Sequence, residues 1–425
     1  MAPPVGHQPD RWLAIVVIVV CAAWPAGCSR GAPSPSTPPV TPARAATGTA
    51  TPAATGSSAA TVGAGPSVPG AQTLAAASAQ PSELTPPANL DLSRLPGIPL
   101  SEGLIVVTSV AEERGDYEVV KRISGPAADR IHISYSATVP VAGQPTELHG
   151  QRIVLTRDLQ SARIYRVRWL SGRTELARGT TALGISTEVF EEVRRDGRSE
   201  CSLASIEEAG SLLGATGLPS PEFEGELERV EQRPVPVPVI LDGERAWLPA
   251  IHARGTFEGL TGEVDAEFWF LDDPRNPLTL RAVIGTARLV VVRIDRPKST
   301  DSTRLERALA SDEQVELPGV YFEFASARLR PESEAAIAEV VGVLRRHPDW
   351  RVRLEGHTDS IGGADANLGL SRARAGAVRQ AVIDRFGGGA DRLEAAGFGL
   401  TRPRERNDTA EGRASNRRVE IVRVR

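Results

Sequence analysis

Hydrophobic positions recur most regularly between residues 311 and 425. Val320–Phe324 is an apolar run that predicts a strand, and Trp350–Glu355 alternates as a strand with one buried face does. Between them, Pro331 suits the first turn of a helix. The apolar positions that follow at helical spacing are Ile337, Val340, Val341 and Leu344. The pattern therefore predicts a helix between two strands.

A second helix and a last strand complete this segment. Gly387–Gly389 is a stop signal for that helix, and Arg418–Ile421 begins the strand. The apolar stripe of the helix is Ala373, Ala377, Val378, Ala381 and Val382. We expect the order β-α-β-α-β-β with the helices on one face of the sheet, which is an α+β sandwich over residues 311–425.

Residues 91–310 read as a mostly antiparallel β domain of unknown function. Four stretches predict strands: residues 104–107, 131–135, 163–169 and 288–292. Residues 263–270 and 278–284 flank a turn-forming segment and predict a hairpin. Pro234, Pro236 and Pro238 alternate with valines, which predicts an edge strand or an extended arm because proline cannot donate to a ladder. A short helix is expected near Glu188–Arg195.

The N-terminus has the pattern of a targeting signal. Trp12–Trp24 is an apolar run of about 13 residues, short of the ~20 that a spanning helix needs. It ends in Pro25-Ala26-Gly27-Cys28, which resembles the lipobox of bacterial lipoproteins, although Pro25 replaces the usual Leu. We therefore expect a signal peptide over 1–27 and a lipid on Cys28. A plain signal peptide cut elsewhere, or an uncleaved anchor, is the alternative.

Residues 28–90 consist almost entirely of Ala, Pro, Ser, Thr and Gly. Such a segment buries too little apolar surface to offset its ordering entropy, so we expect a disordered linker. Its random-coil span would be on the order of 40 Å. It serves either as inert filler or as a spacer between a lipid and a folded domain.

Charge, cysteine and histidine exclude several kinds of function. The formal net charge of -4 gives no reason to expect nucleic acid. With processing at Cys28, Cys201 is the one thiol left, so no intrachain disulfide forms, and the scattered histidines lack zinc-ligand spacing. We find no nucleophile elbow or phosphate loop. We therefore expect no enzyme activity, no metal and no cofactor, with Cys201 an incidental buried thiol.

Three ordered blocks near the C-terminus resemble the OmpA-like peptidoglycan-binding domain. They begin with Gly356-His357-Thr358-Asp359, continue with Asn367-Leu368-Gly369-Leu370-Ser371-Arg372-Ala373-Arg374, and end with Asn416-Arg417-Arg418-Val419-Glu420-Ile421. Phe322–Leu329 resembles the opening strand of that family. The resemblance covers about a quarter of the chain. Ala325 and Leu400 depart from the family, which often has Asp or Asn and Glu at these positions.

The resemblance implies a ligand and a site. The family's ligand is the diaminopimelate of the peptidoglycan stem peptide, whose free end carries an ammonium and a carboxylate. Asp359 would pair with the ammonium, and Arg374 would bind the carboxylate through two parallel hydrogen bonds. Asn367 would supply polar contacts, Phe324 would support the pocket floor, and Arg418 would add positive potential. The plainer interpretation is that Asp359 caps a turn and Arg374 is a solvated helix residue.

These features together suggest a lipid-anchored protein of the outer membrane, facing the periplasm, that links the membrane to the cell wall without covalent bonds. The β domain would be free to bind an envelope protein partner. One alternative is a lipid-handling or enzymatic β domain that the peptidoglycan-binding domain merely localises. Another is a motor-stator subunit, but the short N-terminal apolar run without an acid disfavours it.

Overall fold

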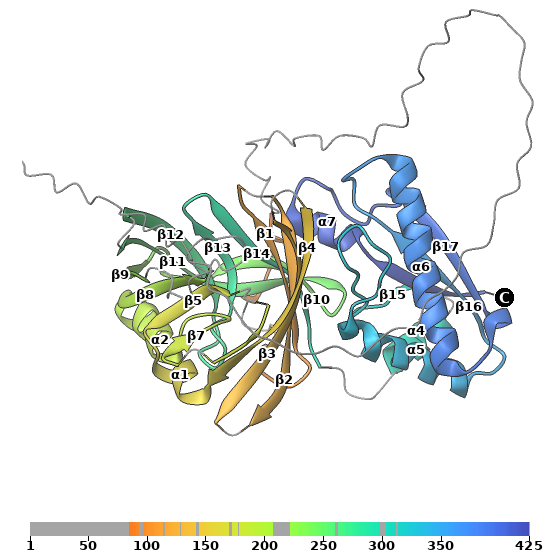
Figure 1. The fold of residues 1–425 in the computed structure, drawn as a ribbon, viewed down its shortest axis with the longest axis horizontal. Coiled ribbons are helices and arrows are strands. Elements are labelled where there is room, and N and C mark those ends of the chain that lie inside the picture. The colour runs from red at the N-terminus through yellow and green to blue at the C-terminus, as the bar shows by residue number, and fades with distance from the viewer. Residues whose placement is uncertain are drawn as a thin grey trace, which may run out of the picture. The chain divides into compact units, whose positions relative to one another are not determined.

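The computed structural model describes residues 85–424, apart from residues 93–96, 114, 128, 142–143, 170–171, 177, 207–221, 260–261, 298–302 and 312. The expected signal peptide, the lipidation site and nearly all of the expected linker lie outside the described residues. We call the part up to Asp295 the β domain and the part from Thr303 the C-terminal domain (Figure 1).

Within the residues that the structure describes, the β domain is one sheet of 14 strands with two helices. The order along the sheet is β6-β4-β3-β2-β1-β14-β13-β12-β11-β9-β8-β5-β7, and β10 pairs with β11 and β14. The strands are β1 Ile105–Ala111, β2 Tyr117–Ala127, β3 Arg130–Val141, β4 Gln144–Leu155, β5 Ile164–Trp169, β6 Thr174–Leu176, β7 Thr180–Thr181, β8 Arg198–Ile206, β9 Glu222–Arg229, β10 Val235–Leu241, β11 Glu244–Gly259, β12 Gly262–Leu271, β13 Thr279–Ile284 and β14 Ala287–Asp295. The helices are α1 Thr156–Ser161 and α2 Thr187–Asp196.

This sheet curls over a single apolar core. The hydroxyl of Tyr165 on β5 donates to Thr279 on β13 at 2.8 Å, although four strands separate the two along the sheet. Phe190 of α2, Phe257 and Phe268 are fully buried in the same core. Burial raises the pKa of the Cys201 thiol in this core to about 12, so the thiol stays protonated. The core of the β domain therefore fills the concave face of the sheet.

The β-domain predictions are largely confirmed. β12 and β13 form the expected antiparallel hairpin, and α2 occupies the expected helical segment. Ser186 caps α2 by accepting from Val189 N, and Gly197 ends it at φ 82. The proline-rich strand β10 pairs with β11, but its last residues, Ile240 and Leu241, also pair with β14. The edge therefore extends only over the part of β10 that contains the prolines.

The C-terminal domain is a four-stranded sheet of order β15-β18-β16-β17 with helices packed against it (Figure 1). Its strands are β15 Val315–Glu316, β16 Arg351–His357, β17 Leu393–Gly399 and β18 Val419–Val424. Its helices are α4 Thr303–Ala310, η2 Pro331–Ser333, α5 Glu334–Arg346, α6 Ala364–Phe386, η3 Ala390–Arg392 and α7 Ala410–Asn416. Among the described strands of this sheet, only β16 and β17 pair in parallel.

The structure confirms the α+β class of this domain and corrects three details. The expected opening strand at Val320–Phe324 is instead a tight loop with a single bridge between Phe322 and Leu329, and β15 is the first strand. Helix α7, which was not predicted, lies between β17 and β18. The stripe on α6 is confirmed at Val378 and Val382, which are buried, but Ala373 is exposed and Ala375, outside the predicted stripe, is buried.

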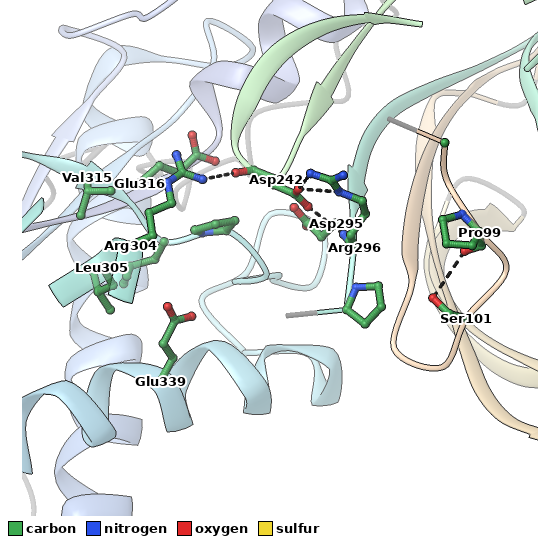
Figure 2. Close-up of a pocket in the computed structure, with 14 residues that line it drawn as sticks. Pro99, Ser101, Asp242, Asp295, Arg296, Arg304, Leu305, Val315, Glu316 and Glu339 are labelled. Atoms are coloured by element: carbon green, nitrogen blue, oxygen red, sulfur yellow. Dashed lines mark hydrogen bonds and ion pairs between the residues drawn. The ribbon is translucent and has the colours of Figure 1, made fainter. Parts of the chain in front are cut away.

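A pocket of about 590 Å³ lies where the two domains meet (Figure 2). Arg296 binds Asp242 at 2.6 Å, and Arg304 donates to the backbone oxygen of Asp242 at 2.9 Å. Glu316, also in the lining, binds Arg293 at 2.8 Å. These charges satisfy one another, and neither Asp359 nor Arg374 lines this pocket. We therefore place the candidate site elsewhere.

Candidate functional site

Asp359 lies in the loop that follows β16. Its Oδ1 accepts from the backbone nitrogen of Ile361 at 3.0 Å, which tightens the loop. Asn367, in the first turn of α6, donates from Nδ2 to the backbone oxygen of Ile361 at 3.0 Å. Both Asp359 and Asn367 are buried. Asn367 therefore braces the loop that presents Asp359, and Asp359 does help to form a turn.

Arg374 projects from α6 into the same region and is buried rather than solvated. Its Nε donates to the backbone oxygen of Ser326 at 3.0 Å, and its guanidinium lies 5.0 Å from the ring centre of Phe322. Within the described part of the chain, its two terminal nitrogens have no hydrogen-bond acceptor. Those nitrogens form the fork that could bind a carboxylate in parallel.

Arg417, which follows α7, joins the acid to this cluster. Its Nη1 donates to Asp359 Oδ2 at 2.6 Å, and its Nη2 binds Glu118 of β2. Burial opposes the charge of Arg417, but Glu118 and Asp359 overcome burial and raise its pKa. Burial and repulsion from Arg417 lower the pKa of Arg374 to about 10, although Asp359 and Glu118 partly offset them. Both guanidinium groups therefore remain charged at neutral pH.

The structure places two predicted residues away from these groups. Phe324 is 61% exposed, and Phe322 supplies the ring beneath Arg374. Arg418 turns toward Glu420, with Nε 2.8 Å from Oε1, while the neighbouring Arg417 reaches Asp359. Asp359, Asn367 and Arg374 do come together. Sequence reasoning overlooked Arg417 and Phe322, although both lie inside the segments that carry the family resemblance.

Two glycines allow α6 to approach the sheet. A Cβ on Gly356 of β16 would lie 2.1 Å from Ser371 O, and one on Gly397 of β17 would lie 2.3 Å from Arg372 N. Real Cβ atoms do not come so close to backbone atoms. The absence of side chains at these two positions therefore sets the depth of the helix that carries Arg374.

Glu355, His357 and Glu420 form a buried acidic cluster beside this site. Arg353 donates to Glu355 at 2.7 Å, Gln314 donates to Glu355 at 2.9 Å, and His357 Nε2 lies 3.1 Å from Glu420. Burial would raise the pKa of Glu420, but the neighbouring His357 ring and the hydrogen bond from Arg418 lower it to about 2. Because side-chain donors already occupy these oxygens, we interpret the cluster as an ion-pair network that holds β16 and β18 together.

Comparisons with known proteins agree on the last quarter of the chain. Residues 321–417 match the model of the OmpA family. The probable lipoprotein YiaD of Escherichia coli is 43% identical over 103 residues, 24% of this chain and 47% of that protein. The peptidoglycan-binding protein ArfA of Mycobacterium bovis is 40% identical over 96 residues, 23% of this chain and 29% of that protein.

Among solved structures, the peptidoglycan-associated lipoprotein of Burkholderia pseudomallei is 31% identical, with a TM-score of 0.24, covering 25% of this chain and 88% of that chain. The chain spans less than half the length of the curated relatives it matches. No helix within the described residues is long and apolar enough to cross a bilayer. The matched blocks surround Asp359, Arg374 and Arg417, and residues 321–417 of this chain are therefore an OmpA-family domain.

Proposed function

We propose that this protein binds peptidoglycan non-covalently through Asp359 and Arg374. The observation that carries the proposal is an acid and a base buried beside each other in an OmpA-family domain, where the fork of Arg374 has no acceptor among the described residues. The free end of diaminopimelate is a zwitterion, so its ammonium would pair with Asp359 and its carboxylate with Arg374. A relative that is named for peptidoglycan binding supports the ligand class.

The low exposure of both charged groups strengthens this assignment. Exposed ion pairs contribute little to binding, whereas charges removed from water and held by neighbours interact strongly. Asp359 and Arg374 are each 8% exposed, and Ile361 N, Ser326 O and the Phe322 ring hold them in place. These contacts therefore fix the positions of the acid and the base relative to their neighbours.

The proposed role of the whole protein is to link a membrane to the cell wall. Cys28 would carry the lipid, in the outer membrane facing the periplasm, and residues 28–90 would span the gap as a disordered tether. Several acyl chains suffice for stable anchoring, since each buried methylene contributes about 0.8 kcal/mol. The β domain would be available to a further envelope protein. Labelling with a radioactive fatty acid tests the anchor: label that persists in Cys28→Ala would contradict it.

Sedimentation of the purified full chain with isolated diaminopimelate-containing peptidoglycan tests the pocket. Asp359→Ala and Arg374→Ala should each weaken binding by roughly tenfold or more, because each leaves an opposite charge buried without its partner. Arg374→Lys should also bind poorly, because an ammonium cannot make two parallel bonds.

Matched control variants distinguish the loss of the pocket from a general effect of removing a charge. Asp365→Ala and Arg372→Ala alter exposed residues on α6 close to the site and should bind as the parent does. Equal binding by all variants would refute the pocket. Absence of binding by every form of the protein, including the parent, would refute peptidoglycan as the ligand.

A further inference from the structure

The β domain contacts the C-terminal domain beside the proposed diaminopimelate pocket. Glu118 of β2 binds Arg417 Nη2, while Nη1 of the same guanidinium binds Asp359. Thr138 of β3 accepts from the backbone nitrogen of Phe324 at 3.4 Å. We propose that β2 and β3 of the β domain hold the pocket closed, and that Arg417 and the loop containing Phe324 move away from these strands when peptidoglycan binds. The inference rests on the proposed function.

The acid of the pocket is already fully engaged. Asp359 Oδ1 accepts from Ile361 N, and Oδ2 accepts from Arg417. An incoming ammonium must displace Arg417 or share the carboxylate with it. Glu118 holds Arg417 in this position, since one guanidinium bridges the two acids. Loss of the contact with Glu118 would let Arg417 withdraw and leave Asp359 to the ligand.

Access of a ligand to the pocket is also restricted. Asp359 and Arg374 are each only 8% exposed, so the zwitterionic end of a stem peptide cannot reach both in this arrangement. Phe324 is 61% exposed and lies in the loop whose Ser326 oxygen binds Arg374. That loop is the one that Thr138 touches. Movement of this loop away from β3 would uncover the terminal nitrogens of Arg374.

The closing contacts that β3 makes are weak and incompletely satisfied. Three hydrogen bonds join β3 to the loop and to η2, at the long distances of 3.3 Å for Ser136 to Glu332 and 3.4 Å for Thr138 to both Phe324 and Arg330. Arg330 Nη1 and Glu332 Oε2 are buried and have no hydrogen-bond partner among the described residues. Buried polar groups without partners cost free energy, so the contact between β3 and this loop is poised to open.

The rest of the interface is better packed and would stay together. Its apolar cluster joins Tyr321 and Ala414 of the C-terminal domain to the β domain residues Ile105, Val107, Val120, Ile240 and Val292. Arg293 of β14 also binds Glu316 of β15 at 2.8 Å. Opening is therefore a local movement of the Phe324 loop and of Arg417, not a separation of the domains.

The test compares binding of the full chain and its variants to isolated peptidoglycan. Glu118→Gln removes the charge that holds Arg417 and should tighten binding about threefold, the scale of one partly exposed ion pair. Thr138→Val removes the acceptor for Phe324 and Arg330 and should act in the same direction. Glu263→Gln, an exposed change at the β11–β12 hairpin, should bind as the parent does.

A double variant identifies where the added binding occurs. Glu118→Gln combined with Asp359→Ala should lose the gain, because the gain passes through the pocket. Unchanged or weaker binding by Glu118→Gln, or a gain that survives Asp359→Ala, would overturn the closure. If the parent binds and depends on Asp359, such results leave the proposed function standing. Failure of every form to bind would instead remove both proposals.

Discussion

At the scale of single residues, Ala325 has an unusual backbone conformation. Its φ is 49, in the left-handed region that costs most residues roughly 1–2 kcal/mol and glycine nothing. The turn that needs this conformation places Ser326 O against Arg374 Nε. Ala325 is therefore a strained position inside the candidate site.

Ala325→Gly should raise the free energy of unfolding by about 0.5–1 kcal/mol. Relief of the left-handed strain exceeds the additional backbone entropy that glycine loses on folding. Ala327→Gly, two residues on and without positive φ, should lower stability instead. Urea denaturation of the full chain measures both changes, and a loss of stability in Ala325→Gly would show that the turn is not strained.

The same loop explains why the resemblance led to the wrong aromatic residue beneath Arg374. Glu323 N binds Arg328 O at 3.0 Å, and Ser326 N binds Glu323 O at 3.2 Å, so the chain reverses directly after Phe322. The reversal turns Phe324 outward. Arg418 was misplaced for another reason. It is two residues from Glu420, on the same face of the extended chain, so it binds that acid and leaves Arg417 for Asp359.

At the scale of elements, α6 shows what periodicity can and cannot locate. The glycine stop signal was correct, since Gly387 ends α6 at φ 80. The buried face was harder to find because it contains Asn367, Ser371 and Arg374, which a hydrophobic pattern counts as exposed. The resemblance to the OmpA-like family identified Asn367 and Arg374 as site residues, which the hydrophobic pattern of the helix could not do. Functional residues often break the local rule in this way.

The close approach of α6 to the sheet gives a prediction at this scale. Gly397→Ala places a methyl group against Arg372 N and should cost about 1–3 kcal/mol of stability. It should also weaken peptidoglycan binding, because α6 must shift and carries Arg374 with it.

Gly369→Ala is the matched control for this change. Gly369 lies on α6 with open space around its Cβ position, so alanine should stabilise the helix by about 0.5–1 kcal/mol. Thermal denaturation measures the change in stability of each variant, and sedimentation with peptidoglycan measures the change in binding. A Gly397→Ala protein with parental stability and binding would show that the packing of α6 on the sheet is not what positions Arg374.

At the scale of the whole molecule, sequence reasoning could not reach the contacts between the two domains. Glu118 and Arg417 lie 299 residues apart, and no local pattern links them. The curl of the large sheet was hidden in the same way, because strand order depends on long-range pairing. Periodicity identified many of the strands, but not which residues of the β domain would face the C-terminal domain.

Asp295 provides a test of how this interface responds to pH. It ends β14, is buried, and accepts a hydrogen bond from the hydroxyl of Tyr321 in the C-terminal domain. Burial raises the pKa of Asp295, although Arg293 and the hydrogen bond from Tyr321 act in the opposite direction. The folded protein therefore binds this proton more tightly than the unfolded chain does. The contribution of Asp295 to the free energy of unfolding therefore falls as the pH rises from the ordinary carboxyl pKa near 4 through the raised pKa of Asp295 in the folded protein.

The side chain of Asp295→Asn does not ionise, so the variant avoids the loss of stability that ionisation of Asp295 causes. It should melt a few degrees above the parent at pH 7, and the difference should shrink as the pH approaches 4 and the parent carboxyl takes up its proton. Asp265→Asn, on an exposed part of β12, should show no such trend. Lower stability of Asp295→Asn at pH 7 would mean that attraction to Arg293 outweighs the cost of burial. The charge on Asp295 would then help to join the domains, and acid would loosen the interface instead of tightening it.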